Sequence, residues 1–99
     1  MQNTTIIELV NIAHALSVAT GRKPTAISGE YLGGGPRLQQ IENGISDVGA
    51  NKADEYIARM SRDWPADKQI PLALLNWRHR QEAFAHPEYS HDAYYGKVS

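Results

Sequence analysis

The chain has 99 residues, of which 41% are apolar and 21% are charged, and this composition suits one globular domain rather than a disordered segment. It contains no cysteine, which excludes a disulfide framework, a thiolate metal site and a cysteine nucleophile. The formal net charge of −1 lacks the basic surplus that most nucleic-acid binders show. Without a signal peptide or a membrane-spanning apolar stretch, we expect a cytoplasmic protein with no membrane contact.

The first helix is expected from about Thr4 to Ala19. Thr5 and Glu8 have the spacing of a capping box, in which each side chain accepts a backbone N–H of the other residue. Gly21 is placed to end the helix in the left-handed conformation. Apolar residues recur every three or four positions and predict one buried stripe, which contains Ile6, Leu9, Val10, Ile12, Ala13 and Leu16.

Two short helices follow, and a run of glycines separates them. Pro24 suits the first position of the second helix, because its missing N–H costs nothing there. The glycines at 33–35 cannot continue a helix cheaply and therefore predict a turn. They lack the preceding strand and the Lys-Ser/Thr ending of a phosphate-binding loop. Pro36 then opens a third helix over residues 36–43, which Gly44 closes.

The remaining elements are also helical. A fourth helix is expected over residues 50–62, and Pro65 prevents it from continuing much further. A fifth is expected from about Ile70 or Pro71 to Ala85. No stretch alternates as a strand would, so the predicted fold class is all-α, a compact bundle of about five helices. We assign residues 1–85 to this domain and residues 86–99 to a partly ordered C-terminal tail.

The unit at residues 24–43 has the pattern of a helix-turn-helix, in which the second helix lies in the major groove. Its outward side chains are of the types that read base edges, since Gln and Asn can bind adenine and Arg can bind guanine. The alternatives are a solvated helix face and a bundle that binds no DNA. The predicted base contacts are Arg37, Gln39, Gln40 and Asn43, and the predicted phosphate contacts are Arg22, Lys23, Thr25 and Lys52.

Several short segments resemble a family of small proteobacterial and phage-associated helix-turn-helix proteins. The resemblance covers about Leu9 to Pro65 and implies DNA binding by a repressor-like or accessory regulator. The segments that carry it are Ala-Thr-Gly-Arg-Lys-Pro-Thr-Ala-Ile-Ser at 19–28, Gly-Gly-Gly at 33–35, Arg-Leu at 37–38, Asn-Gly at 43–44 and Met-Ser-Arg-Asp-Trp-Pro at 60–65.

The fifth helix is more apolar than a four-helix unit requires, which predicts a homodimer interface at Leu72, Leu75 and Trp77, although this helix could equally fold back on its own chain. A dimer also suits DNA reading, because two half-sites usually need two copies. His79, His86 and His91 lack the close spacing of zinc ligands, so we expect neither a metal nor a cofactor. No arrangement of side chains indicates an enzyme.

The sequence therefore predicts a sequence-specific transcriptional regulator that binds double-stranded DNA, and the resemblance implies that it is repressor-like. One alternative is a helical protein–protein interaction module, such as a phage accessory or an inhibitor of another regulator, which the near-neutral charge and the apolar fifth helix favour. Another is a regulator that senses a small molecule in a pocket between the first, fourth and fifth helices.

Overall fold

The computed structural model describes residues 4–45 and 48–85, and these contain five α-helices and no β-strand. The predicted all-α fold class is therefore confirmed. The observed bounds lie within one or two residues of those expected from the sequence. The helices are α1 (Thr4–Thr20), α2 (Pro24–Tyr31), α3 (Arg37–Glu42), α4 (Ala50–Arg62) and α5 (Leu72–Ala85).

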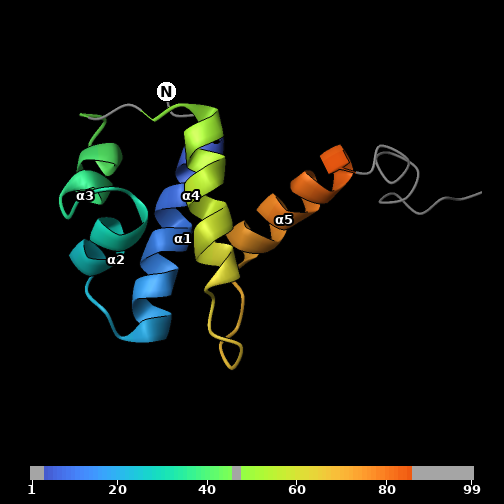
Figure 1. The fold of residues 1–99 in the computed structure, drawn as a ribbon, viewed down its shortest axis with the longest axis horizontal. Coiled ribbons are helices and arrows are strands. Elements are labelled where there is room, and N and C mark those ends of the chain that lie inside the picture. Colours follow the sequence, from blue (N-terminus) through green and yellow to red (C-terminus); the bar gives the residue numbers. More distant parts are fainter. Residues whose placement is uncertain (1–3, 46–47, 86–99) are drawn as a thin grey trace, which may run out of the picture.

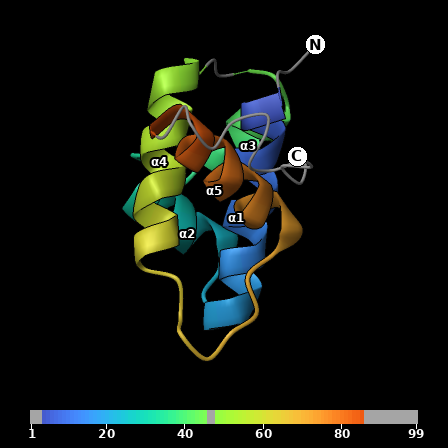
Figure 2. The same ribbon diagram turned by 90° about the vertical axis from the view of Figure 1, so that its right-hand side faces the viewer.

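The helices form three layers, with α1 and α4 side by side in the middle (Figure 1). The short helices α2 and α3 cover one side of this pair. Helix α5 starts on the opposite side and projects away from the bundle, and a view turned by 90° shows it in front of α1 and α4 (Figure 2). The two short helices are therefore exposed at one end of the molecule's long axis, and α5 at the other.

One apolar core joins the layers, and α1 supplies most of its centre. The stripe predicted for α1 is buried, except that Val10 lies at its edge. Helix α4 turns the apolar side of an amphipathic helix towards it. The buried apolar residues are Ile6, Leu9, Ile12, Ala13, Leu16, Ile27, Tyr31, Leu32, Leu38, Ile41, Ala53, Tyr56, Ile57, Met60, Leu74 and Trp77.

The helix ends follow the glycine and proline signals of the sequence. Gly21, Gly33 and Gly44 all have positive φ, at 72°, 93° and 73°, and each follows the end of a helix. Only glycine adopts this region without strain, because it has no Cβ. Pro24 occupies the first turn of α2 as predicted.

The predicted capping box at Thr5 and Glu8 is wrong. Helix α1 has already begun at Thr4, so Thr5 lies inside the helix rather than at its cap. The Glu8 side chain is only 9% exposed, and its carboxylate accepts two hydrogen bonds from the Arg80 guanidinium, one of them of 2.8 Å. A buried carboxylate needs a charged partner, and α5 provides one.

Two further polar contacts hold α5 against α4. The Trp77 indole N–H donates to Asp54 Oδ1 at 2.9 Å, and Arg78 Nε donates to Ser61 Oγ at the same distance. Trp77 is 7% exposed and belongs to the core, so its predicted place in a dimer interface needs correction. A large ring with one polar atom is well placed where a carboxylate meets apolar neighbours.

Candidate nucleic-acid interface

The two short helices meet at a corner formed by residues 32–36. The Ser28 side chain is fully buried where they cross, and Gly35 in the corner lies near Thr25 and Gly29 of α2. An added Cβ on Gly35 would lie 3.8 Å from the Thr25 carbonyl oxygen, which is an ordinary contact. Buried Ile27 and Leu38 complete the crossing, so α3 has a fixed apolar side and a solvent-facing side.

The structure divides the four predicted base contacts into two pairs. Gln39 and the C-cap residue Asn43 are exposed, lie four positions apart, and form one edge at the end of α3. Arg37 and Gln40 are half-buried, and the Arg37 Nε is buried without a hydrogen-bond partner in the described part of the chain. Glu42 is exposed on the same edge as Gln39 but was not among the predicted contacts. Its spacing of three from Gln39 was the sequence signal that could have placed it on this edge.

The predicted phosphate contacts do not form one cluster. Arg22, Lys23 and Thr25 follow the C-terminal end of α1, whereas Lys52 lies in the first turn of α4, near the opposite end of α1 (Figure 1). Arg22 Nη1 pairs with Glu30 Oε1 at 2.6 Å, and Lys52 Nζ lies 3.6 Å from Glu55 Oε2. Both pairs are solvent-exposed, and such pairs contribute little to stability.

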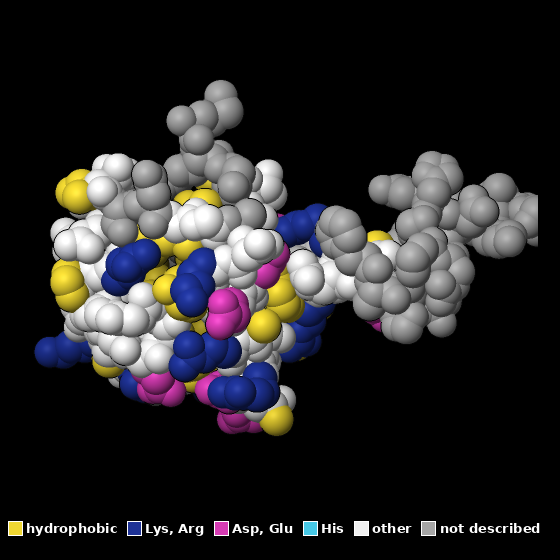
Figure 3. All heavy atoms as spheres, turned by 45° about the horizontal axis from the view of Figure 1, so that its top comes forward, with side chains coloured by type: hydrophobic (Ala, Val, Ile, Leu, Met, Phe, Trp, Pro, Cys, Tyr) yellow, Lys and Arg dark blue, Asp and Glu magenta, His cyan; other side chains and the backbone are white. Residues whose placement is uncertain are grey.

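Other cations lie on the exposed stripe of α4, which contains Lys52, Glu55, Arg59 and Arg62 at spacings of three and four. Lys and Arg side chains gather with a few acidic ones on the face over this helix (Figure 3). Arg62 pairs with Asp63 at 3.0 Å, whereas Arg59 forms no ion pair among the described residues. The spacing of Arg59 from Lys52 was visible in the sequence, yet Arg59 was not among the predicted contacts.

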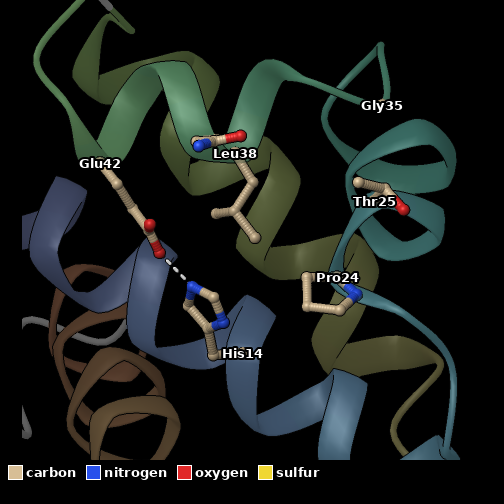
Figure 4. Close-up of a pocket in the computed structure, with 7 residues that line it drawn as sticks. His14, Pro24, Thr25, Gly35, Leu38 and Glu42 are labelled. Atoms are coloured by element: carbon tan, nitrogen blue, oxygen red, sulfur yellow. Dashed lines mark hydrogen bonds and ion pairs between the residues drawn. The ribbon is translucent and has the colours of Figure 1, made fainter.

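A hollow of about 200 Å³ lies beside α3, between this helix, α1 and the start of α2 (Figure 4). His14 Nε2 and Glu42 Oε1 form a hydrogen bond across it, which joins α1 to α3. Sites for drug-sized ligands usually measure roughly 300–1,000 Å³, so this hollow suits a smaller group. Its lining residues are His14, Pro24, Thr25, Gly35, Leu38, Gln39 and Glu42.

The Tyr31 hydroxyl, at the end of α2, donates to Asp63 Oδ2 at 2.9 Å and so links α2 to the end of α4. Burial, and then the hydrogen bond to Asp63, raise the pKa of Tyr31 above its ordinary value. Hydrogen bonds from Arg62 and Tyr31 lower the pKa of Asp63. The unit of α2 and α3 is thus attached to α1 through Glu42 and to α4 through Tyr31.

No family model, no curated protein and no solved structure matches this chain.

Among the described residues, no three His, Asp or Glu side chains come together as metal ligands. His86 and His91, together with the predicted tail at residues 86–99, lie outside the described residues. None of the described helices combines the length and the apolar character needed to cross a bilayer.

Proposed function

We propose that this protein binds double-stranded DNA sequence-specifically as a repressor-like transcriptional regulator, with α3 in the major groove. The observation that carries the proposal is the exposed edge of α3. A six-residue helix, supported by α2, presents Gln39 to solvent, and its C-cap residue Asn43 is exposed beside it; both side chains can bind adenine through two hydrogen bonds. Arg37 and Gln40, which are half-buried, would contribute from the side of the same helix.

Cations near both ends of α1 would contact the DNA backbone. Lys23 is exposed and forms no ion pair among the described residues, and Thr25 beside it offers a hydroxyl. Arg22 and Lys52 would exchange their exposed carboxylate partners for phosphates. This exchange reconciles the proposal with a net charge of −1, because the interface needs a locally basic surface only.

We further propose that the protein acts as a cytoplasmic homodimer. Leu72 and Leu75, three positions apart on α5, are 71% and 37% exposed, and together they offer an apolar surface that a second copy could cover. In a two-fold dimer, two copies of α3 would face half-sites about 34 Å apart, one turn of the duplex. A palindromic operator is then expected, and occlusion of a promoter is the simplest mode of repression.

The deciding experiment is selection of duplexes from a random pool, followed by affinity measurements on the selected sequence. We expect Gln39→Ala and Asn43→Ala each to weaken specific binding by roughly ten- to a hundredfold, which corresponds to a loss of about 1–3 kcal/mol per bidentate pair. Gln69→Ala serves as the control, because it removes an exposed glutamine from the loop before α5. Affinity should also fall steeply as salt is raised.

The second candidate function is a helical protein–protein interaction module, which the exposed leucines of α5 favour. The two candidates give opposite results in the selection experiment. A folded protein that enriches no duplex, or whose affinity for DNA does not change with salt, would contradict DNA binding and favour this module.

A further inference from the structure

Helix α3 is too short to be stable on its own. It has six residues, and isolated helices of fewer than about 12 residues are marginal in water. Its N-cap residue is Pro36, which provides no side-chain cap for the free backbone N–H groups at the start of the helix. The Arg37 N–H bonds to the Gly34 carbonyl in the corner, but the Leu38 N–H is buried and needs an acceptor that Pro36 does not offer.

Ser28, on the neighbouring helix α2, provides this partner. Its Oγ accepts a hydrogen bond of 2.9 Å from the backbone N–H of Leu38, in the first turn of α3. The same hydroxyl donates to the Gly34 carbonyl oxygen at 2.5 Å. The Gly34 carbonyl also accepts from the Arg37 N–H at 3.1 Å, and the Gly34 N–H donates to the Ser28 carbonyl at 3.3 Å. One fully buried side chain thus connects α2, the corner and α3.

We infer that Ser28 is the positioning residue of the DNA-reading helix: it caps α3 from α2 and sets the orientation in which Gln39 and Asn43 face the groove. This inference rests on the proposed function. Without the hydroxyl, the buried Leu38 N–H would lose its acceptor, which is unfavourable, and the Gly34 carbonyl would keep only the Arg37 N–H. The first turn of α3 would then move towards water, and the edge that carries Gln39 would move with it.

The chain contains a matched control at its other corner. Ser17 is 8% exposed, and its Oγ donates to the Arg22 carbonyl oxygen at 2.5 Å, in the turn between α1 and α2. Its geometry resembles that of Ser28 towards Gly34, but none of its hydrogen bonds involves an N–H of the following helix. Ser17→Ala therefore removes a comparable hydroxyl–carbonyl bond and leaves the cap of α3 in place.

The test compares the ratio of specific to non-specific affinity for wild type, Ser28→Ala, Ser28→Cys and Ser17→Ala, well below the unfolding temperature of each. The cysteine variant keeps nearly the volume of serine and replaces the hydroxyl with a weak hydrogen-bonding thiol, so it serves if the alanine variant does not fold. We expect the ratio to fall at least about tenfold in the Ser28 variants, because base contacts are lost while phosphate contacts remain. Ser17→Ala should stay within about twofold of wild type.

Hydrogen exchange gives a second reading that does not depend on DNA. The Leu38 amide should exchange faster in both Ser28 variants and stay protected in Ser17→Ala. Suppose that the wild type does select a DNA sequence. If the Ser28 variants then keep the protection of the Leu38 amide, or keep the ratio of specific to non-specific affinity, the inference about Ser28 is wrong and the proposed function still stands. A wild type without any sequence preference would overturn the proposed function and the reading role of Ser28 together.

Discussion

At the scale of single residues, Glu8 shows how a local pattern can mislead. Its spacing from Thr5 predicts a capping box, but its carboxylate turns towards Arg80, 72 positions later in the chain. Burial decides between the two, because a carboxylate next to the core gains more from a guanidinium than from a backbone N–H that solvent can also satisfy. A sequence pattern of four residues contains no information about a partner on another helix.

We predict that Glu8→Ala lowers the free energy of unfolding by about 2 kcal/mol, because it leaves the Arg80 guanidinium without its carboxylate. The loss should stay below that of a fully buried pair, since the Arg80 side chain is 40% exposed and can regain water. Urea denaturation measures the difference. Glu55→Ala, which removes the exposed partner of Lys52, is the control and should change stability by less than about 0.5 kcal/mol.

Residues that control only their own backbone were predicted well. Gly21, Pro24 and Gly44 mark helix ends in the sequence, and the structure places them there. Their effect is local, because a missing Cβ or a missing N–H acts on the residue itself. Trp77 was assigned to an interface but lies in the core. The outcome depends on how α5 packs against α1 and α4, which the apolar pattern of α5 does not specify.

At the scale of elements, the corner between α2 and α3 depends on one of its three glycines more than on the others. Gly33 has a φ of 93°, whereas Gly34 and Gly35 do not adopt positive φ. The sequence predicts a turn from the whole run, but the run itself does not reveal which glycine must remain glycine. Only the backbone conformation distinguishes them.

We predict that Gly33→Ala destabilises the protein by about 1–2 kcal/mol, the cost of holding a Cβ in the left-handed region. Gly34→Ala should be close to neutral or slightly stabilising, because a Cβ there meets nothing within 4 Å and alanine restricts the unfolded chain. Thermal and urea unfolding of the two variants provide the comparison. Equal changes in both would show that the corner does not depend on Gly33 in particular.

The exposed edge of α3 could be predicted only in part. Leu38 and Ile41, three apart, indicate which side is buried, and both are in the core. Whether a flanking residue such as Arg37 or Gln40 is fully exposed depends on how deeply α3 sits against its neighbours, and this is a property of the packed bundle. The interaction of Glu42 with His14 likewise joins two helices that are distant in the sequence.

At the scale of the whole molecule, α5 is the element least integrated with the rest. It projects from the bundle (Figure 1), and Leu74 and Trp77 are its residues in the apolar core among the described side chains. Polar contacts of the Trp77, Arg78 and Arg80 side chains also attach it to α1 and α4. Its other side, with Leu72 and Leu75, faces solvent and is available to a second copy.

We predict that Leu72→Glu converts the proposed dimer into a monomer without loss of helix content, because Leu72 is 71% exposed and contributes little to the core. Sedimentation velocity and circular dichroism give the two readings. Ile45→Glu is the control, since Ile45 is 74% exposed but lies after α3. A variant that remains dimeric would place the interface elsewhere, and specific DNA affinity should fall only if dimerisation is lost.

The buried position of Trp77, whose indole donates a hydrogen bond to Asp54, makes its fluorescence a probe of the attachment of α5. The chain has two tryptophans, and Trp77 lies where α5 meets α4, shielded from water. Detachment of α5 would bring the indole into water and shift its fluorescence to longer wavelength, whereas Trp64 lies in the loop after α4 and would report on a different region. With Trp64→Phe as the background, docking and release of α5 could be followed in solution on the millisecond timescale without any attached label.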